Sequence, residues 1–156
     1  MRLLIDADGC PVVDICVKAA KDFGIECHIF CDTSHEFSKD GAECHVVPKG
    51  ADSADFCLVN FAKPGDVVIT QDYGLASMAL SRGARVLNQD GLEYTEFNID
   101  ALLLARHTAK KIRNAGGRLR GNPKREKASD IEFERKLFEI LKNKRLTKVR
   151  LDDIIT

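Results

Sequence analysis

The chain has 156 residues, 44% of them hydrophobic, which is enough for one globular domain with its own core. No apolar run approaches the roughly 20 residues that span a bilayer, and the first residues lack the pattern of a signal peptide. We therefore expect a cytoplasmic protein that makes no membrane contact. The formal net charge is zero, but residues 1–105 hold 8 Lys and Arg against 17 Asp and Glu, whereas residues 106–150 hold 16 against 5. This asymmetry is typical of proteins that contact nucleic acid.

Strands and helices are predicted to alternate along the chain. Runs rich in apolar and β-branched residues predict strands at 2–6, 25–30, 43–47, 67–70 and 85–88. Apolar residues at helical spacing predict helices at 12–23, 52–62, 73–82, 98–114 and 129–143. This alternation indicates an α/β fold, a Rossmann-like three-layer sandwich with a mainly parallel five-stranded sheet in the order 3-2-1-4-5. We expect a single domain over residues 1–143, which includes the basic loop and last helix (106–143), and a tail over 144–156.

Six cysteines sit among the residues of predicted strands and helices rather than in turns. We expect them to be reduced and mostly buried, because free cysteine behaves as a small hydrophobic residue. The stretch CHIFC, with Cys44 and His45 close by, matches no ligand spacing typical of structural zinc, so core packing is the preferred interpretation.

Carboxylates follow the first and fourth predicted strands. Asp6 and Asp8 end the run LLIDAD, and Asp72 follows VVIT. In an open α/β sheet the carboxyl ends of neighbouring strands form the binding crevice, so these acids should converge there. Asp52 and Asp55, in the helix after the third strand, could reach the same crevice. Clustered carboxylates repel one another unless a cation neutralises them, and oxygen-only ligands suit Mg²⁺ or Mn²⁺.

The predicted site follows from these acids. We expect Asp6, Asp8 and Asp72 to be catalytic and, together with Asp55, to bind the metal ion. Residues expected to orient these ligands, a water molecule or a phosphate are Thr70, Ser53 and Asp52. Asp8 and Asp72 could instead cap the helices that follow them. Asp66, in the turn KPGD, is interpreted as a surface residue.

The basic segment predicts contacts with a nucleic-acid backbone. With no Trp and only two Tyr, the chain is poorly supplied for base stacking, so binding should depend on phosphate contacts and on salt. The expected partner is RNA, and an exposed helix could also mediate a homodimer. The predicted contact residues are Arg106, Lys110, Lys111, Arg113, Arg118, Arg120, Lys124 and Arg125.

Several stretches together resemble one protein family. IDADGCP, GADSADFCLV, GDVVITQDYGLA, LNQDGLEYTEFNI and GGRLRGNPK resemble the YaiI/YqxD family of uncharacterised bacterial proteins, over residues 1–141. The resemblance implies a PIN-like domain, from a group of metal-dependent nucleases with a Mg²⁺ or Mn²⁺ site. In such domains one Asp ends the first strand, here Asp6, and another follows a Thr after the fourth, here Asp72. An acid from the middle of the domain would be Asp55 or Asp52, and Asp8 would replace a further acid that is missing after Asp72.

Together these patterns predict a metal-dependent hydrolase that cleaves phosphodiester bonds, with RNA as the expected substrate. One alternative is a non-catalytic nucleic-acid-binding module, which the basic segment alone would support. Another is a haloacid-dehalogenase-like phosphatase, because LLIDADG resembles its DxDG signature, with Asp6 as nucleophile and Asp8 as acid–base. That family also needs a second acidic pair, for which Asp66 and Asp72 are spaced one residue too far apart.

Overall fold

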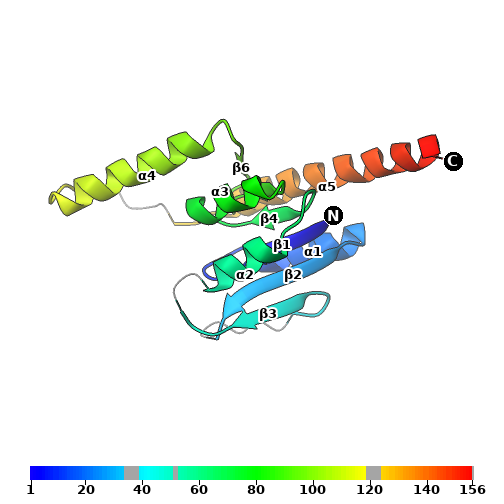
Figure 1. Ribbon diagram of the computed structural model, residues 1–156, viewed down its shortest axis with the longest axis horizontal. Coiled ribbons are helices and arrows are strands. Elements are labelled where there is room, and N and C mark those ends of the chain that lie inside the picture. The colour runs from blue at the N-terminus through cyan, green and yellow to red at the C-terminus, as the bar shows by residue number, and fades with distance from the viewer. Residues whose placement is uncertain (34–38, 51–52, 119–123, 156) are drawn as a thin grey trace.

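The fold is built on a six-stranded sheet in the order β3-β2-β1-β4-β5-β6 (Figure 1). The computed structural model describes residues 1–33, 39–50, 53–118 and 124–155, apart from the side chains of 144–152 and 155. The first five strands are parallel and confirm the predicted order. A sixth, β6, was not predicted and pairs antiparallel with β5. The strands are β1 (Arg2–Asp6), β2 (Glu26–Asp32), β3 (Glu43–Val47), β4 (Val67–Ile69), β5 (Arg85–Leu87) and β6 (Glu93–Tyr94).

Helices cover both faces of the sheet and complete the predicted three layers. The helices are α1 (Val13–Phe23), α2 (Ser53–Phe61), α3 (Tyr73–Ser81), α4 (Ile99–Asn114) and α5 (Lys127–Ile155). One core cluster joins the sheet to α1 and α5, and the other joins it to α2, α3 and the start of α4. The outer ends of α4 and α5 extend from opposite sides of the molecule (Figure 1).

The central strand β1 shows why its sequence is a continuous apolar run. Leu3 and Ile5 pack in the cluster with α1 and α5, whereas Leu4 packs in the cluster on the other face. All three side chains are fully buried. A parallel strand covered by helices on both faces has no solvent-facing side, so alternation between apolar and polar residues disappears.

The bounds predicted for the last helix differ from the structure. The last helix runs over Lys127–Ile155 rather than 129–143. Its residues Phe133, Leu137 and Leu141, at helical spacing, pack on the sheet side of the molecule, and this packing stripe is the part of the helix that the sequence pattern detected. The division into a domain over 1–143 and a tail over 144–156 stays a prediction.

The interpretation of Asp66 as a surface residue is wrong. Asp66 is 3% exposed, and its carboxylate accepts hydrogen bonds from the guanidinium of Arg2, at 2.7 Å from Nη2, and from the backbone N–H of Lys63. The Arg2 guanidinium and these bonds outweigh the effect of burial and lower the pKa of the Asp66 carboxyl below its usual value. Turn composition gave no sign of this pair, because its partners lie at the starts of two different strands.

The cysteines are free thiols, as predicted, and three of them are buried in the core: Cys16, Cys27 and Cys31. Burial raises the pKa of Cys27 to about 12 and also raises the pKa of Cys10, beside the acidic strand end. Thiols with such raised pKa values are poor nucleophiles at neutral pH. Among the described helices, none combines the length and the apolar character needed to cross a bilayer.

Candidate functional site

A cleft of about 760 Å³ lies at the carboxyl ends of the parallel strands. Its walls come from the ends of β1 and β2, the starts of α2 and α3, and one side of α4. This is the position at which open α/β sheets bind ligands. The polar residues that line the cleft are Asp6, Asp8, Asp32, Ser53, Asp55, Gln71, Asp72, Tyr73, Arg106 and Arg113.

A short chain of hydrogen bonds ties Asp6 to Asp72. The buried hydroxyl of Thr70 donates to Oδ2 of Asp6 at 2.8 Å and accepts the backbone N–H of Asp72 at 3.0 Å. The contact arises from the sheet register, because Ile5 of β1 pairs with Ile69 of β4 and the next residues are Asp6 and Thr70. Thr70 therefore contacts the carboxylate of Asp6 and the backbone of Asp72, and its predicted role in orienting ligands stays a prediction.

Asp72 is also a helix cap. Its Oδ1 accepts the backbone N–H of Leu75 at 3.1 Å at the start of α3. The capping alternative from the sequence is thus correct for Asp72, although the same side chain lines the cleft. At the start of α1 the N-cap residue is Val12, which makes no side-chain cap bond, and the capping alternative for Asp8 stays a prediction.

The environment of Asp6 disfavours its negative charge. Burial is the largest of the effects that together raise its pKa to about 7, and the hydrogen bond from Thr70 only partly opposes it. The negative charges of Asp55, Asp8 and Asp72 each raise the pKa further. All four predicted metal-binding acids line the same cleft.

The remaining predicted residues of the acidic wall come from loops and a helix start. Asp8 lies in the turn after β1, where Gly9 has a positive φ of 70° and its carbonyl accepts the Gln71 side chain at 3.1 Å. Ser53 and Asp55 belong to the first turn of α2 and line the cleft. Asp52 lies outside the described residues.

One acid in the cleft was missed by the sequence analysis. Asp32 is the last residue of β2 and lines the same cleft as Asp6. The predicted strand ends at residue 30, before Asp32. The available signal was the position itself, since an acid directly after the buried run HIFC is equivalent to Asp6 after LLI.

The described acids of the cleft do not form a compact set of three ligands. Among the described residues, the one set of three His, Cys, Asp or Glu side chains with ligand atoms mutually within 4.8 Å is His28, Glu43 and His45, outside this cleft. The cleft acids are thus spaced too widely for three of them to bind one ion directly in this arrangement. Such spacing suits Mg²⁺, which binds through one or two carboxylates and keeps several waters.

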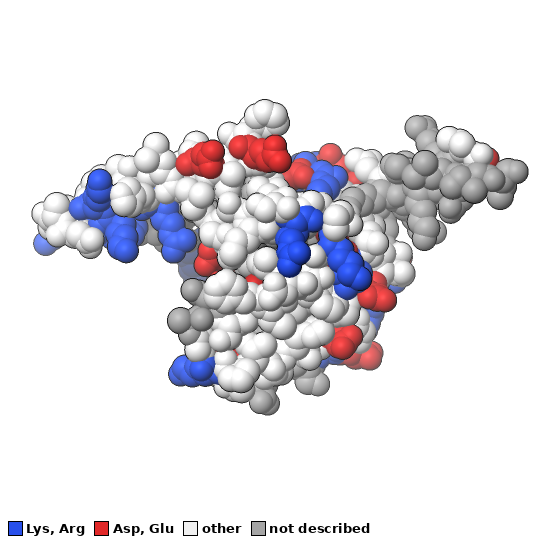
Figure 2. Space-filling view, viewed as in Figure 1, with Lys and Arg blue, Asp and Glu red and all other residues white. Residues whose placement is uncertain are grey.

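Two arginines of α4 line the same cleft as the acids. Arg106 and Arg113 line it together with Ala109, at the spacing of one helix stripe. The Arg106 guanidinium lies 5.9 Å from the centre of the Tyr73 ring, a cation–π distance. Figure 2 shows Lys and Arg gathered along the outer part of α4.

The other predicted basic contacts do not line the cleft. Lys110, Lys111, Arg118 and Lys124 are exposed. Arg125 forms ion pairs with Asp90 and Asp130, and these contacts give its side chain a structural role near the start of α5. Arg120 lies outside the described residues.

Comparisons with known proteins agree with the sequence resemblance. A sequence model of a family described as "Uncharacterized BCR, YaiI/YqxD family" matches residues 4–143. A "UPF0178 protein" of Ruminiclostridium cellulolyticum is 49% identical over 142 residues, which are 91% of this chain and 93% of the relative. Proteins of the same name are 44% identical in Exiguobacterium sibiricum (92% of this chain, 99% of the relative) and 44% identical in Alkaliphilus oremlandii (96% of each). No solved structure matches the chain.

Proposed function

The chain belongs to the YaiI/YqxD family, whose description assigns no activity, and we propose that it is a divalent-metal-dependent nuclease acting on RNA. One observation carries the proposal: several acids and two arginines line a single cleft at the carboxyl ends of the strands. Hydrolysis of a phosphodiester uses both kinds of residue. The negative charge that develops in the transition state has to be stabilised, and the nucleic-acid backbone has to be bound in place. The PIN-like character implied by the motifs is part of the same proposal.

The acidic residues present suit Mg²⁺ or Mn²⁺. The carboxylates supply hard oxygen donors, and none of the described residues that line the cleft is His or Cys. The pKa of about 7 at Asp6 reflects unfavourable charge that a bound cation would relieve. Asp6, Asp8, Asp55 and Asp72 would hold the ion, partly through water, with Asp32 as a further candidate. When bound, the ion would lower the pKa of a water molecule and polarise the phosphoryl oxygen.

The protein's own residues then have distinct roles. Thr70 fixes the orientation of Asp6, and the cap contact with Leu75 fixes Asp72, so neither carboxylate has to reorganise when substrate enters. Arg106 and Arg113 would bind the phosphates on either side of the scissile bond. The Tyr73 ring contacts the guanidinium of Arg106 and would offer one aromatic face to a base.

The alternatives gain less support. The phosphatase interpretation pairs Asp66 with Asp72, but these residues flank β4 at opposite ends, and Asp66 is engaged by Arg2. A non-catalytic RNA-binding module would use the arginines but give no role to the acids around Asp6. The experiment below separates the three functions.

The test combines metal titration with two substrates. Calorimetry with Mn²⁺ and Mg²⁺ compares the wild type with Asp6→Asn/Asp72→Asn, and with Asp100→Asn as the control, because Asp100 is an exposed acid outside the cleft. The same samples are incubated with labelled single-stranded RNA and with p-nitrophenyl phosphate.

The proposal expects metal binding and RNA cleavage in the wild type and the control, and neither in the double variant. Turnover of the monoester without RNA cleavage would favour the phosphatase. RNA binding without metal binding would leave a non-catalytic binding module.

A further inference from the structure

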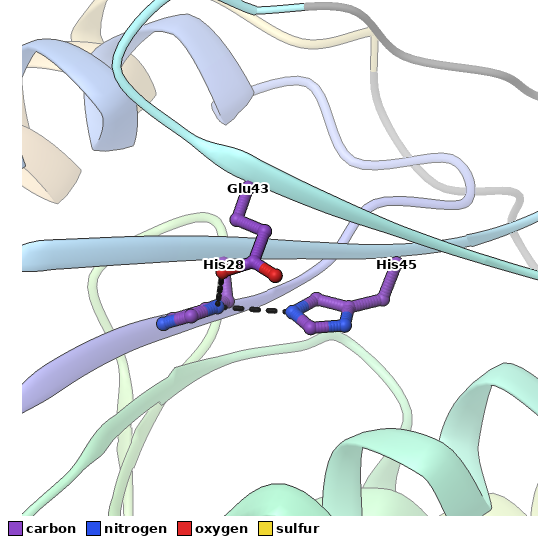
Figure 3. Close-up of side chains that lie close together, drawn as sticks. All are labelled: His28, Glu43 and His45. Carbon is purple, nitrogen blue, oxygen red and sulfur yellow. Dashed lines mark hydrogen bonds and ion pairs between the residues drawn. The ribbon is translucent and has the colours of Figure 1, made fainter.

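Three metal-ligating side chains meet on the sheet face toward α2, away from the acidic cleft. His28 lies on β2, and Glu43 and His45 lie on the edge strand β3; they point toward one another (Figure 3). The parallel register explains the meeting, since His28 pairs with Glu43 and Phe30 pairs with His45. Residues two apart on a strand share a face, so all three side chains lie on one side of the sheet.

The distances between their ligand atoms match those around a bound metal ion. Nδ1 of His28 lies 2.9 Å from Nε2 of His45 and 3.6 Å from Oε2 of Glu43. Ligand atoms about 2.0–2.2 Å from one ion are separated by about 2.8–3.1 Å in octahedral geometry and by about 3.3–3.6 Å in tetrahedral geometry. An ion could therefore replace the His28–His45 hydrogen bond with movements of a few tenths of an ångström.

The histidine rings are held in place by neighbouring groups. Nε2 of His28 lies 3.1 Å from Oε2 of Glu26, a contact that favours a proton on Nε2 and a lone pair on Nδ1. Carboxylates often orient metal-binding histidines in this way. The His28 ring packs against Phe61 at 4.6 Å between centroids, and His45 stacks on Phe30 at 4.6 Å.

We infer that His28, Glu43 and His45 form a binding site for a divalent transition-metal ion, with Zn²⁺ as the best fit and water completing the coordination. Two imidazoles and one carboxylate suit Zn²⁺ and similar ions better than Mg²⁺. His28 is 5% exposed whereas Glu43 is exposed. The ion would therefore lie near the surface, with His28 on its buried side and Glu43 on its solvent side. Such an ion would fasten the edge strand β3 to β2.

This site is separate from the acidic cleft and does not depend on the proposed nuclease function. His28 precedes Asp32 by four residues on β2, a distance of about 13 Å along a strand. The nearby guanidinium of Arg2, which stacks on Phe61, has its charge balanced by Asp66. The two sites also differ in ligand chemistry, which makes them separable by the choice of metal ion.

The neighbouring cysteines provide a matched control. Cys44 stands between Glu43 and His45 in the sequence, but it packs with Cys27 against the core on the opposite face of the sheet. A thiol-based zinc site would therefore use the other face. Cys44→Ser tests that alternative without touching the three proposed ligands.

The experiment titrates metal-free full-length protein with Zn²⁺ by calorimetry under reducing conditions, and with Co²⁺ by visible absorption. His45→Gln and Glu43→Gln each remove one ligand at a half-buried or exposed position, and circular dichroism checks that each variant folds. His107→Gln removes an exposed histidine of α4 and serves as a second control.

We expect Zn²⁺ binding to weaken in His45→Gln by more than the roughly 10- to 100-fold that loss of an orienting partner costs. Glu43→Gln should show a smaller loss, and both controls should bind as the wild type does. In the wild type, Zn²⁺ should raise the melting temperature, and His45→Gln should lose that rise. Absence of Zn²⁺ binding to the wild type, equal binding by His45→Gln, or loss of binding in Cys44→Ser would each overturn the inference.

These outcomes are independent of the nuclease proposal. Asp6→Asn/Asp72→Asn should bind Zn²⁺ at the histidine site as the wild type does, and His45→Gln should bind Mn²⁺ unchanged. Loss of Mn²⁺ binding with retained Zn²⁺ binding identifies a change at the cleft alone.

Discussion

The raised pKa of Asp6 makes the stability of the protein depend on pH in a defined way. The folded-state pKa is about 7 against an ordinary value of 3.8, so between these pH values the folded chain binds more protons than the unfolded chain. Wild-type stability should therefore fall as the pH rises through this window. The difference in pKa sets an upper limit of about 4 kcal/mol for the cost of ionising Asp6.

Asp6→Asn removes this cost because the amide does not ionise, and its Oδ1 can still accept the hydroxyl of Thr70. In EDTA at pH 8.5 we expect the variant to be more stable than the wild type by about 2–4 kcal/mol, since part of the maximum cost is relieved by remaining solvent. At pH 4 the two proteins should be equally stable. Urea unfolding followed by circular dichroism across this pH range measures the difference.

Mn²⁺ should cancel most of the stability difference between the two proteins. At about 100 times its dissociation constant, a bound ion stabilises the wild type by about 2.7 kcal/mol, and the variant should gain little. Asp100→Asn, which removes an exposed acid, should change stability by less than about 0.5 kcal/mol at every pH. A variant that is no more stable than the wild type at pH 8.5, or a difference that is independent of pH, would refute the reasoning about Asp6.

Two further predictions concern the buried ion pair and the basic wall. Asp66→Ala leaves the guanidinium of Arg2 without its carboxylate and should lower the free energy of unfolding at pH 7 by about 3 kcal/mol. Because the pKa of Asp66 is lowered, its contribution is present above the unfolded value and lost as the pH falls through the folded value, so urea unfolding should show a smaller effect at pH 3. Arg106→Ala/Arg113→Ala should weaken binding of single-stranded RNA and reduce its salt slope by about 1.4, or roughly 0.7 for each lost phosphate contact. Lys110→Ala/Lys111→Ala is the control, because it removes equal charge from the same helix outside the cleft. If fluorescence anisotropy shows equal losses of RNA affinity in both variants, the cleft is not the RNA-binding site.

Local sequence patterns were sufficient to predict the arrangement of the parallel strands. The buried runs LLI and VVI predicted neighbouring parallel strands, because the alternation with helices leaves few other arrangements. The same reasoning placed Asp6 and Asp72 at adjacent strand ends, where Thr70 now joins them. Strand ends are a short-range property of the chain, and their convergence follows from the sheet order.

The elements that were missed depend on partners distant in the sequence. β6 has two residues, Glu93 and Tyr94, and exists as a strand because β5 pairs with it. Asp32 belongs to β2 because it pairs with Val47 of β3, which lengthens the strand beyond its apolar run. Neither contact leaves a periodic signal that a short window could detect.

By itself, the sequence determined the order of the strands, the two-sided core and an acidic edge, because hydrophobic periodicity and strand ends are local features. The tertiary structure alone decided that Asp66 is buried against Arg2, that Asp32 joins the cleft, and that His28 meets Glu43 and His45. The physical reason is shared by all three: each depends on which residues of separate strands are brought side by side by sheet pairing, and that register is set by the packing of the whole domain.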